Sequence, residues 1–367
     1  MSLIELDPKH IASRIQIARS WMGKSAPEVA AQLNIAPSTY RGYESGLSIN
    51  DSVLEQIAAI LNVPVKFFQM GPLSLIPSGE LSFRKRVRLK SPFVMHVRAV
   101  SSFLSDLVIE QERLLDLPKV KVPYARASGI VEIEDIVKNI RNDLSIVDAP
   151  LKSALDLVES LGVSVFWVTS DPDFDAVSFW SEDRPYILIN ETHKDGYRVR
   201  FSVLHELGHL VLHRHSNATD TYEDDAVRLE RDANAFASAM LMPAIPFTYR
   251  FSTHWGLMDI FEERVHWRAS CAAIVRRARD LKIISEERYR QLYIGISTKG
   301  WRKREPGAPN QEESRVHRFF FDEAGEIGLT TDQIANQAGS PISWIYETMP
   351  ISRQYLSNYD LDFPQRF

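Results

Sequence analysis

The most restrictive feature of this sequence is a His-Glu-x-x-His pattern formed by His205, Glu206 and His209. The surrounding residues 201–213 are mostly apolar, which predicts a buried helix. A spacing of four puts the two imidazoles on one helix face, where both can reach a single Zn²⁺ at about 2.0–2.1 Å. Glu206 then stands beside the ion, where it can act on a water molecule. The alternative is a pair of hydrogen-bonded histidines on a partly buried helix.

A catalytic zinc needs a third protein ligand and an open position for water. The helical pattern over residues 225–242 supplies two carboxylates, Glu230 and Asp232. We predict Glu230 as the third ligand, because the chain between it and His209 is long enough for a loop and a returning helix. Asp232 remains open as the alternative ligand. Asn234, one turn beyond Glu230, is predicted to support a ligand by a hydrogen bond.

Two further histidines, His213 and His215, follow the metal pattern. His213 lies two turns from His205, about 12 Å along a straight helix, which is too far to share the ion. We therefore expect both to lie at the surface, to support a ligand or to face substrate. Together with Tyr222 they are also candidates for stabilising a developing oxyanion.

The composition narrows the class of protein. Cys271 is the only cysteine, so an internal disulfide framework and a cysteine-rich metal cluster are excluded. The net charge of −5 shows no overall basic excess, so any nucleic-acid binding must be local. The sequence shows neither a secretory leader nor about 18 consecutive apolar residues. We expect a cytoplasmic protein that does not bind membranes.

A chain of 367 residues is long enough for two or three domains. We predict an all-helical domain over residues 1–70, a linker with a basic run over residues 71–94, a metal-binding domain over residues 95–292 and a C-terminal extension of unknown role over residues 293–367. No internal repeat is evident.

The hydrophobic patterns predict an α+β fold with a small sheet. Helical patterns cover residues 11–21, 27–33, 38–43, 53–61, 94–115, 133–144, 151–161, 198–214, 225–242 and 332–348, and after Pro243 the chain is again mostly helical through Tyr293. Strand patterns cover residues 163–168, 174–180 and 186–189. The strand over residues 174–180 is a candidate edge on which an extended peptide could lie, with an ordinary core strand as the alternative.

The N-terminal domain contains a helix-turn-helix pattern. Ser25 and Glu28 form a capping box that opens one helix, and residues 34–36 form a short turn before the next. Residues 8–70 resemble the Cro/repressor-type (XRE-like) regulators, which implies that Ser38, Thr39 and Arg41 face the major groove of duplex DNA. Acidic and basic residues are six each in residues 1–70, so binding would be weak or need a homodimer. An interaction module without DNA binding is the alternative.

The metal pattern and the following helix resemble the ImmA/IrrE-like zinc metallopeptidases. The similarity rests on residues 205–213, on Glu230-x-x-Ala233-Asn234-x-Phe236-Ala237 and on Leu241-Met242-Pro243. It covers roughly residues 95–290 and implies a zincin-like, gluzincin-like domain with a small β-sheet and a mostly helical C-terminal part. By this resemblance His205, His209 and Glu230 bind zinc and Glu206 is the general base.

The leading hypothesis is a regulatory zinc-dependent endopeptidase fused to a DNA-binding domain. A water molecule activated by zinc would attack a peptide carbonyl, with Glu206 as the general base. The resemblance implies that the protein substrate is a helix-turn-helix repressor. The rival hypothesis is a transcription regulator or antitoxin whose peptidase-like domain binds metal or a ligand without turnover.

Overall fold

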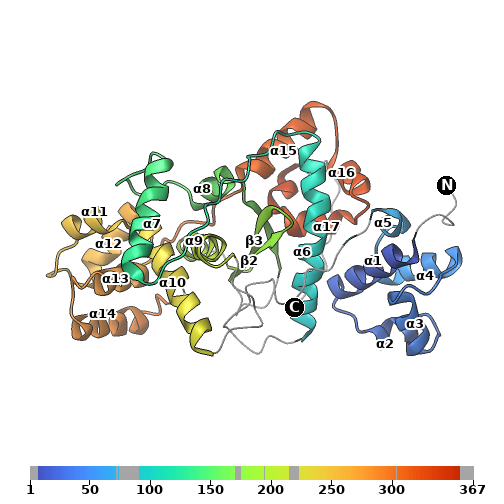
Figure 1. Ribbon diagram of the computed structural model, residues 1–367, viewed down its shortest axis with the longest axis horizontal. Helices are drawn as coiled ribbons and strands as arrows, with labels where there is room; N and C mark the ends of the chain where they lie inside the picture. Colours follow the sequence, from blue (N-terminus) through green and yellow to red (C-terminus); the bar gives the residue numbers. More distant parts are fainter. Residues whose placement is uncertain are drawn as a thin grey trace.

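The computed structural model describes residues 7–71, 73, 91–169, 175–193, 195–214, 223–302 and 304–355. The molecule is elongated (Figure 1), with the N-terminal helices at one end, helices α11–α14 at the other and a small sheet between them. The predicted α+β class is confirmed: helices dominate the chain and three strands form one sheet. Within the described residues, no helix is both long and apolar enough to cross a membrane.

Five short helices make up the N-terminal domain: α1 (Pro8–Trp21), α2 (Ala26–Gln32), α3 (Pro37–Glu44), α4 (Asp51–Leu61) and α5 (Val65–Gln69). The predicted capping box is present, because the Ser25 amide donates to the Glu28 carboxylate over 2.6 Å and the Glu28 amide donates to the Ser25 hydroxyl. Asn34 adopts a left-handed conformation with φ of 55°, which turns the chain sharply between α2 and α3. Val29 and Tyr40 are fully buried at the centre.

The sheet has the order β1-β3-β2, with β1 (Ser164–Val168) parallel to β3 (Arg184–Asn190) and β2 (Ala176–Ser181) antiparallel to it. Both faces are covered. Phe166 and Leu188 point into a core shared with the N-terminal domain, whereas Val165 and Ile187 point into a second core. Because side chains alternate across a strand, each face of the sheet supports a different half of the molecule.

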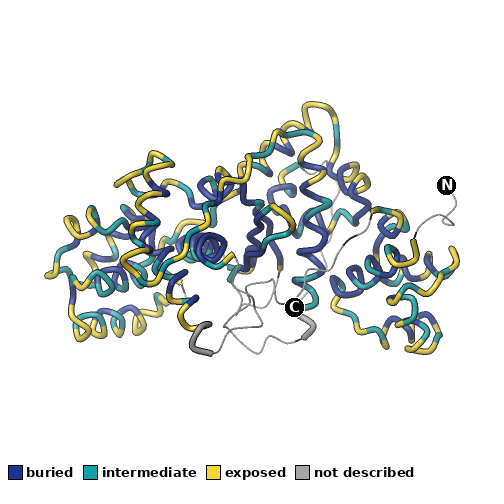
Figure 2. Tube along the Cα trace, in the orientation of Figure 1, coloured by how far each residue is buried: buried dark blue, intermediate teal, exposed yellow. Residues whose placement is uncertain are grey.

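The second core contains the two long helices that carry the predicted metal residues, α9 (Gly196–Leu212) and α10 (Glu223–Leu241). The three strands and α9 are mostly buried (Figure 2). Gly208 allows the two helices to approach closely: a Cβ there would lie 3.2 Å from Ala233 Cα and 3.1 Å from Phe236 Cβ. Glycine at this position therefore allows the close approach of α9 and α10.

The remaining helices surround these two cores. Helix α6 (Ser91–Glu112) runs between the N-terminal domain and the sheet, in the middle of Figure 1. The others are α7 (Ile130–Asp143), α8 (Ala154–Ser160), α11 (Ala244–Arg250), α12 (Leu257–Trp267), α13 (Cys271–Asp280), α14 (Glu286–Thr298), α15 (Arg315–Glu326), α16 (Thr331–Gln337), α17 (Ile342–Thr348) and the 3₁₀ helix η2 (Pro350–Tyr355).

Most predicted elements agree with the structure within a few residues. Helices α5 and α15 and the 3₁₀ helix η2 were not predicted. The predicted helical unit over residues 332–348 is two helices, α16 and α17, separated by a turn at Gly339. The basic run over residues 84–90 lies outside the described residues.

Candidate functional site

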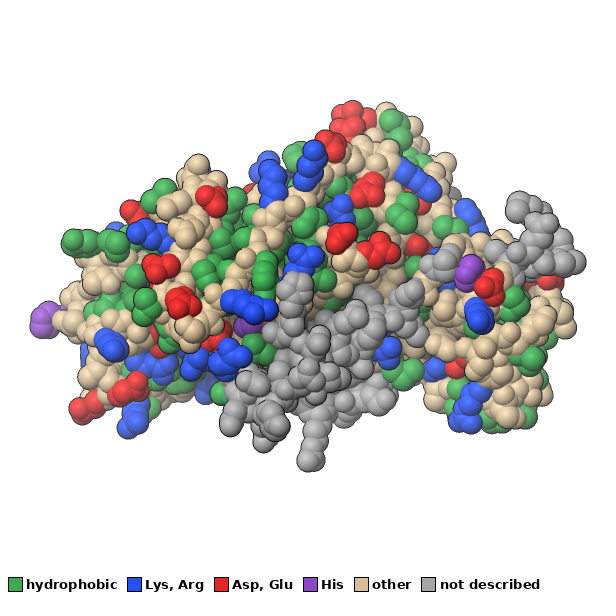
Figure 3. Space-filling model, in the orientation of Figure 1, with side chains coloured by type: hydrophobic (Ala, Val, Ile, Leu, Met, Phe, Trp, Pro, Cys, Tyr) green, Lys and Arg blue, Asp and Glu red, His purple; other side chains and the backbone are tan. Residues whose placement is uncertain are grey.

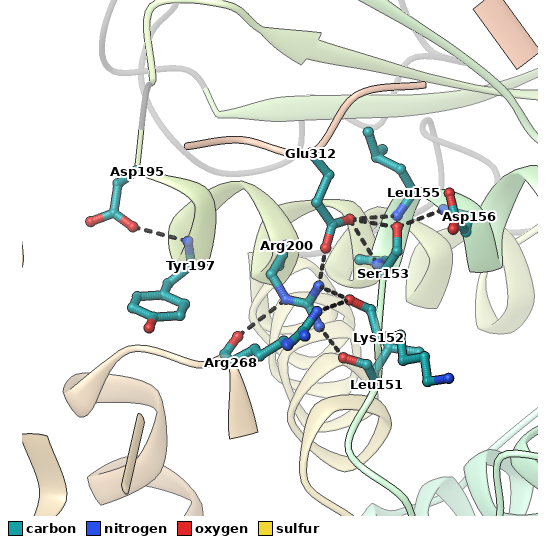
Figure 4. A network of polar contacts seen from close by, with 11 residues as sticks. Leu151, Lys152, Ser153, Leu155, Asp156, Asp195, Tyr197, Arg200, Arg268 and Glu312 are labelled. Atoms are coloured by element: carbon teal, nitrogen blue, oxygen red, sulfur yellow. Dashed lines mark hydrogen bonds and ion pairs between the residues drawn. The ribbon is translucent and has the colours of Figure 1, made fainter. Parts of the chain in front are cut away.

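A partly buried ion pair anchors the first half of α9. Arg200 pairs with Glu312, and its guanidinium also donates to the main-chain carbonyl of Leu151 over 2.7 Å (Figure 4). The other oxygen of Glu312 accepts hydrogen bonds from the amides of Ala154 and Leu155, at the start of α8. Burial lowers the pKa of Arg200 to about 10, so the guanidinium stays charged at neutral pH. The network thus joins α8 and the segment before α15 to α9. It meets α9 at Arg200, which precedes His205 along the helix.

The structure brings together the three predicted ligands. The Nε2 atoms of His205 and His209 face each other at 3.1 Å. Each also lies 3.6 Å from a carboxylate oxygen of Glu230, which reaches across from α10. One ligand atom from each residue falls within 4.8 Å of the others. The three side chains converge on one point.

This arrangement fits a zinc ion by size and by chemistry. A tetrahedral ion with bonds of about 2.0–2.1 Å holds its ligand atoms roughly 3.3–3.4 Å apart, close to the separations of 3.1 and 3.6 Å seen here. Two imidazoles and one carboxylate are a common donor set for catalytic zinc. His209 is buried, while His205 and Glu230 are partly exposed, so the site can be reached from solvent.

The alternative ligand Asp232 lies on a different face of α10. Its carboxylate is buried and pairs with the Arg231 guanidinium at 3.2 Å. Asn234 donates its side-chain amide to the main-chain carbonyl of Glu230 over 2.7 Å. Asn234 thus supports the turn of α10 that carries Glu230, and the geometry favours Glu230 over Asp232 as the third ligand.

Glu206 is buried beside the three residues and has a partner that the sequence did not predict. The Ser178 hydroxyl on β2 donates to Glu206 Oε2 over 2.6 Å, and Ser178 is itself buried. Burial raises the pKa of Glu206 to about 7, while the neighbouring His209 and the hydrogen bond from Ser178 oppose that rise. The hydrogen bond from Ser178 therefore holds the carboxyl group in one orientation beside His209.

His213 ends α9, and its Nδ1 atom lies 2.9 Å from Nδ1 of His209. His213 thus contacts Nδ1 of His209, whereas Nε2 of His209 faces Glu230. This contact agrees with one of the roles expected for His213, the support of a ligand. The other two candidates for oxyanion stabilisation, His215 and Tyr222, lie outside the described residues.

The predicted DNA-contacting residues lie on α3 at the surface of the N-terminal domain. Ser38 and Arg41 are exposed and Thr39 is half-buried. Figure 3 shows Lys and Arg side chains interspersed with Asp and Glu over the visible face, in keeping with the small net charge. The second helix of the motif is therefore accessible to a partner.

Comparison with known proteins agrees with this division of the chain. Residues 158–279 match a peptidase family model described as an IrrE N-terminal-like domain, and residues 15–68 match a helix-turn-helix model. Two uncharacterized HTH-type transcriptional regulators, from Sinorhizobium medicae (strain WSM419) and Rhizobium meliloti (strain 1021), are each 38% identical over 60 residues. That stretch is 16% of this chain and 43% of each relative, so the chain spans less than half the length of these relatives. The chain thus carries an N-terminal XRE-like helix-turn-helix domain followed by an IrrE-like peptidase-family domain.

Proposed function

We propose that this protein is a regulatory zinc-dependent endopeptidase fused to a DNA-binding domain. The convergence of His205, His209 and Glu230 on one point, with Glu206 buried beside it, carries the proposal. The match to a peptidase family model over residues 158–279 supports it. Hydrolysis of an unstructured protein by the zinc-loaded full chain, and its loss after chelation, is the test.

In this proposal His205, His209 and Glu230 hold the metal. A zinc ion bound there supplies Lewis acidity, which lowers the pKa of a water molecule and polarises a peptide carbonyl. Glu206 takes the proton from the attacking water and passes it to the leaving amine. Ser178 keeps the carboxylate of Glu206 oriented, and His213 does the same for the ring of His209.

Strand β2 is the part of the sheet best placed to bind substrate. It is an edge strand of the described sheet, and it carries Ser178 to within 2.6 Å of Glu206. A peptide that adds to this edge would run directly past the base and the metal ligands. The cleft would then select extended segments of a protein substrate.

Substitution of Ser178 by alanine is expected to slow hydrolysis about tenfold through kcat, because the base loses the hydrogen bond from the Ser178 hydroxyl and keeps only the one from the Ser178 main chain. Zinc content and KM should change little, since the Ser178 side chain is buried and its hydroxyl donates to Glu206. Peptide hydrolysis across a range of substrate concentrations measures both constants. Ser297→Ala, which changes an exposed serine on α14, is the control. A rise in KM with unchanged kcat would assign Ser178 to substrate binding instead.

The helix-turn-helix domain is proposed to bind duplex DNA through α3, and a protein with the same type of domain is the proposed substrate. Exposed Ser38 and Arg41 support DNA contact. Fusion to a DNA-binding domain would concentrate the peptidase around regulators that share its DNA site.

Arg41→Ala is expected to weaken binding of a promoter-region duplex by roughly 1–3 kcal/mol if it contacts a base edge. Arg290→Ala, an exposed arginine on α14 at the other end of the molecule, should leave binding unchanged. Gel retardation at low salt measures both. Equal binding by wild type and Arg41→Ala would remove Arg41 from the interface.

The rival function, a regulator that binds metal without turnover, predicts that the base is dispensable. A metal site without chemistry has no need of a buried carboxyl group beside the ligands. The position of Glu206 and its contact with Ser178 therefore favour catalysis.

A further inference from the structure

The C-terminal helices α15–α17 repeat the backbone of the helix-turn-helix helices α1–α3. Capping boxes open α2 at Ser25 and α16 at Thr330, and both helices have seven residues. Left-handed residues follow the same pattern, with φ of 65° at Gly23 and 72° at Gly328. Asn34 and Gly339, with φ of 55° and 63°, turn the chain before α3 and α17. Every pair is separated by the same 305 positions.

The main-chain hydrogen bonds repeat with the same separation. Ile35 donates to the carbonyl of Ala30 over 3.0 Å, and Ser340 donates to that of Ala335 over 2.8 Å. After α1 the amide of Lys24 donates to the carbonyl of Arg19, and after α15 the amide of Leu329 donates to that of Ala324. The two units thus share their turns as well as their helices.

The two units differ at the positions that would contact DNA. In α3, Thr39 is half-buried and Arg41 is exposed, as DNA contact requires. The equivalent positions of α17 hold Trp344 and Tyr346, which are only 2% and 1% exposed. Large side chains buried against protein cannot enter a DNA groove.

Trp344 of α17 packs against the N-terminal domain. The Trp344 ring stacks on that of Trp21, with centroids 3.8 Å apart and planes within 7°. Phe67 of α5 packs edge-on against the same indole at 5.2 Å. Lys66 donates to the carbonyl of Asn336 over 2.6 Å, and a Cβ on Gly339 would lie 2.7 Å from Met70 Cγ. The contact is close and largely aromatic.

Glu347 of α17 joins this contact to the rest of the molecule. Its carboxylate accepts the indole N–H of Trp21 over 3.1 Å and the amide of Thr169, which follows β1, over 3.2 Å. It also pairs with His96 of α6 at 3.3 Å. On the other side of the unit, Arg353 forms a two-point ion pair with Glu191, directly after β3. The unit therefore contacts both the N-terminal domain and the sheet.

We propose that residues 315–355 are a second helix-turn-helix unit that has exchanged DNA binding for protein binding, and that its partner is the N-terminal helix-turn-helix domain of the same chain. Through Glu347 the unit links α1 to the segment that follows β1, and it leaves α3 facing solvent. This gives the C-terminal extension a role and makes α3 the DNA-reading helix of the pair.

Hydrogen–deuterium exchange of the full chain tests the docking. In Trp344→Ala the amides of α1 and α5 are expected to exchange at least about tenfold faster, whereas those of α9 and α10 keep their wild-type rates. Phe319→Ala, an aromatic residue of α15 that is 50% exposed, should change neither set. Wild-type protection of α1 and α5 in Trp344→Ala would overturn the proposal.

If Trp344→Ala also loosens α9 and α10, Glu347→Ala decides the question, because it removes the acceptor of the Trp21 indole without opening a core cavity. Faster exchange in α1 supports docking, and unchanged exchange there contradicts it.

The loss of DNA binding by the second unit is tested with two exposed serines at equivalent positions of α3 and α17, Ser38 and Ser343. Ser38→Glu should reduce retention on a short random-sequence duplex at low salt, and Ser343→Glu should not. Equal reduction by both would show that the second unit reads DNA.

Discussion

Replacement of Glu206 by glutamine is expected to reduce peptide hydrolysis by about 10²–10⁴-fold while zinc remains bound. The amide has nearly the same shape as the carboxylate and can keep a hydrogen bond with Ser178, whose hydroxyl lies 2.6 Å from Glu206 Oε2. It cannot accept a proton from water at neutral pH, so proton transfer to the leaving amine fails. Initial rates with zinc-loaded wild type and variant measure the effect.

The control for this substitution is Glu287→Gln, which changes an exposed carboxylate on α14 and should leave the rate unchanged. Elemental analysis of the same samples separates loss of the base from loss of the metal. Activity of Glu206→Gln within tenfold of wild type would remove Glu206 from the mechanism and favour metal binding without turnover.

Replacement of Glu230 by alanine is expected to empty the metal site during dialysis against metal-free buffer. The substitution removes the carboxylate whose oxygens lie 3.6 Å from the Nε2 atoms of His205 and His209. Only two protein ligands then remain, one fewer than a catalytic zinc needs. Zinc content should fall from about one per chain to near zero. Hydrolysis should fall with it, because the remaining groups cannot activate water by themselves.

Asp232→Asn is the matched control, since it changes the other carboxylate on the same stretch of α10. Asp232 pairs with Arg231 and lies away from the convergence of the ligands, so its amide should leave zinc content near the wild-type value. Loss of zinc in Asp232→Asn with retention in Glu230→Ala would reverse the assignment of the third ligand.

The sequence was most informative where a function needs fixed spacing within one helix. His205, Glu206 and His209 are set by helical periodicity alone, and the structure places their helix within a few residues of the prediction. The capping box at Ser25 and Glu28 located α2 in the same way. Such features depend on neighbours in the sequence and need no knowledge of tertiary contacts.

The contacts missed from the sequence join residues that are far apart along the chain. Ser178 reaches Glu206 because β2 pairs with β3 at the edge of the sheet beside α9, and no local pattern specifies that pairing. Glu312 reaches Arg200 from a segment with neither helical nor strand periodicity. The repeat of α1–α3 in α15–α17 is not evident in the sequence, because the two units share turns and caps and few residue types. Gly23 with Gly328 and Ala30 with Ala335 are among the few identical pairs.

The central claim is that His205, His209 and Glu230 form a zinc site. The most direct measurement is the zinc content of freshly purified wild-type protein, determined by elemental analysis after dialysis against metal-free buffer. The geometry of the three ligands predicts about one zinc per chain, with the same content in Glu206→Gln. Wild-type protein that holds no zinc, and takes up none when zinc is supplied, would contradict the claim.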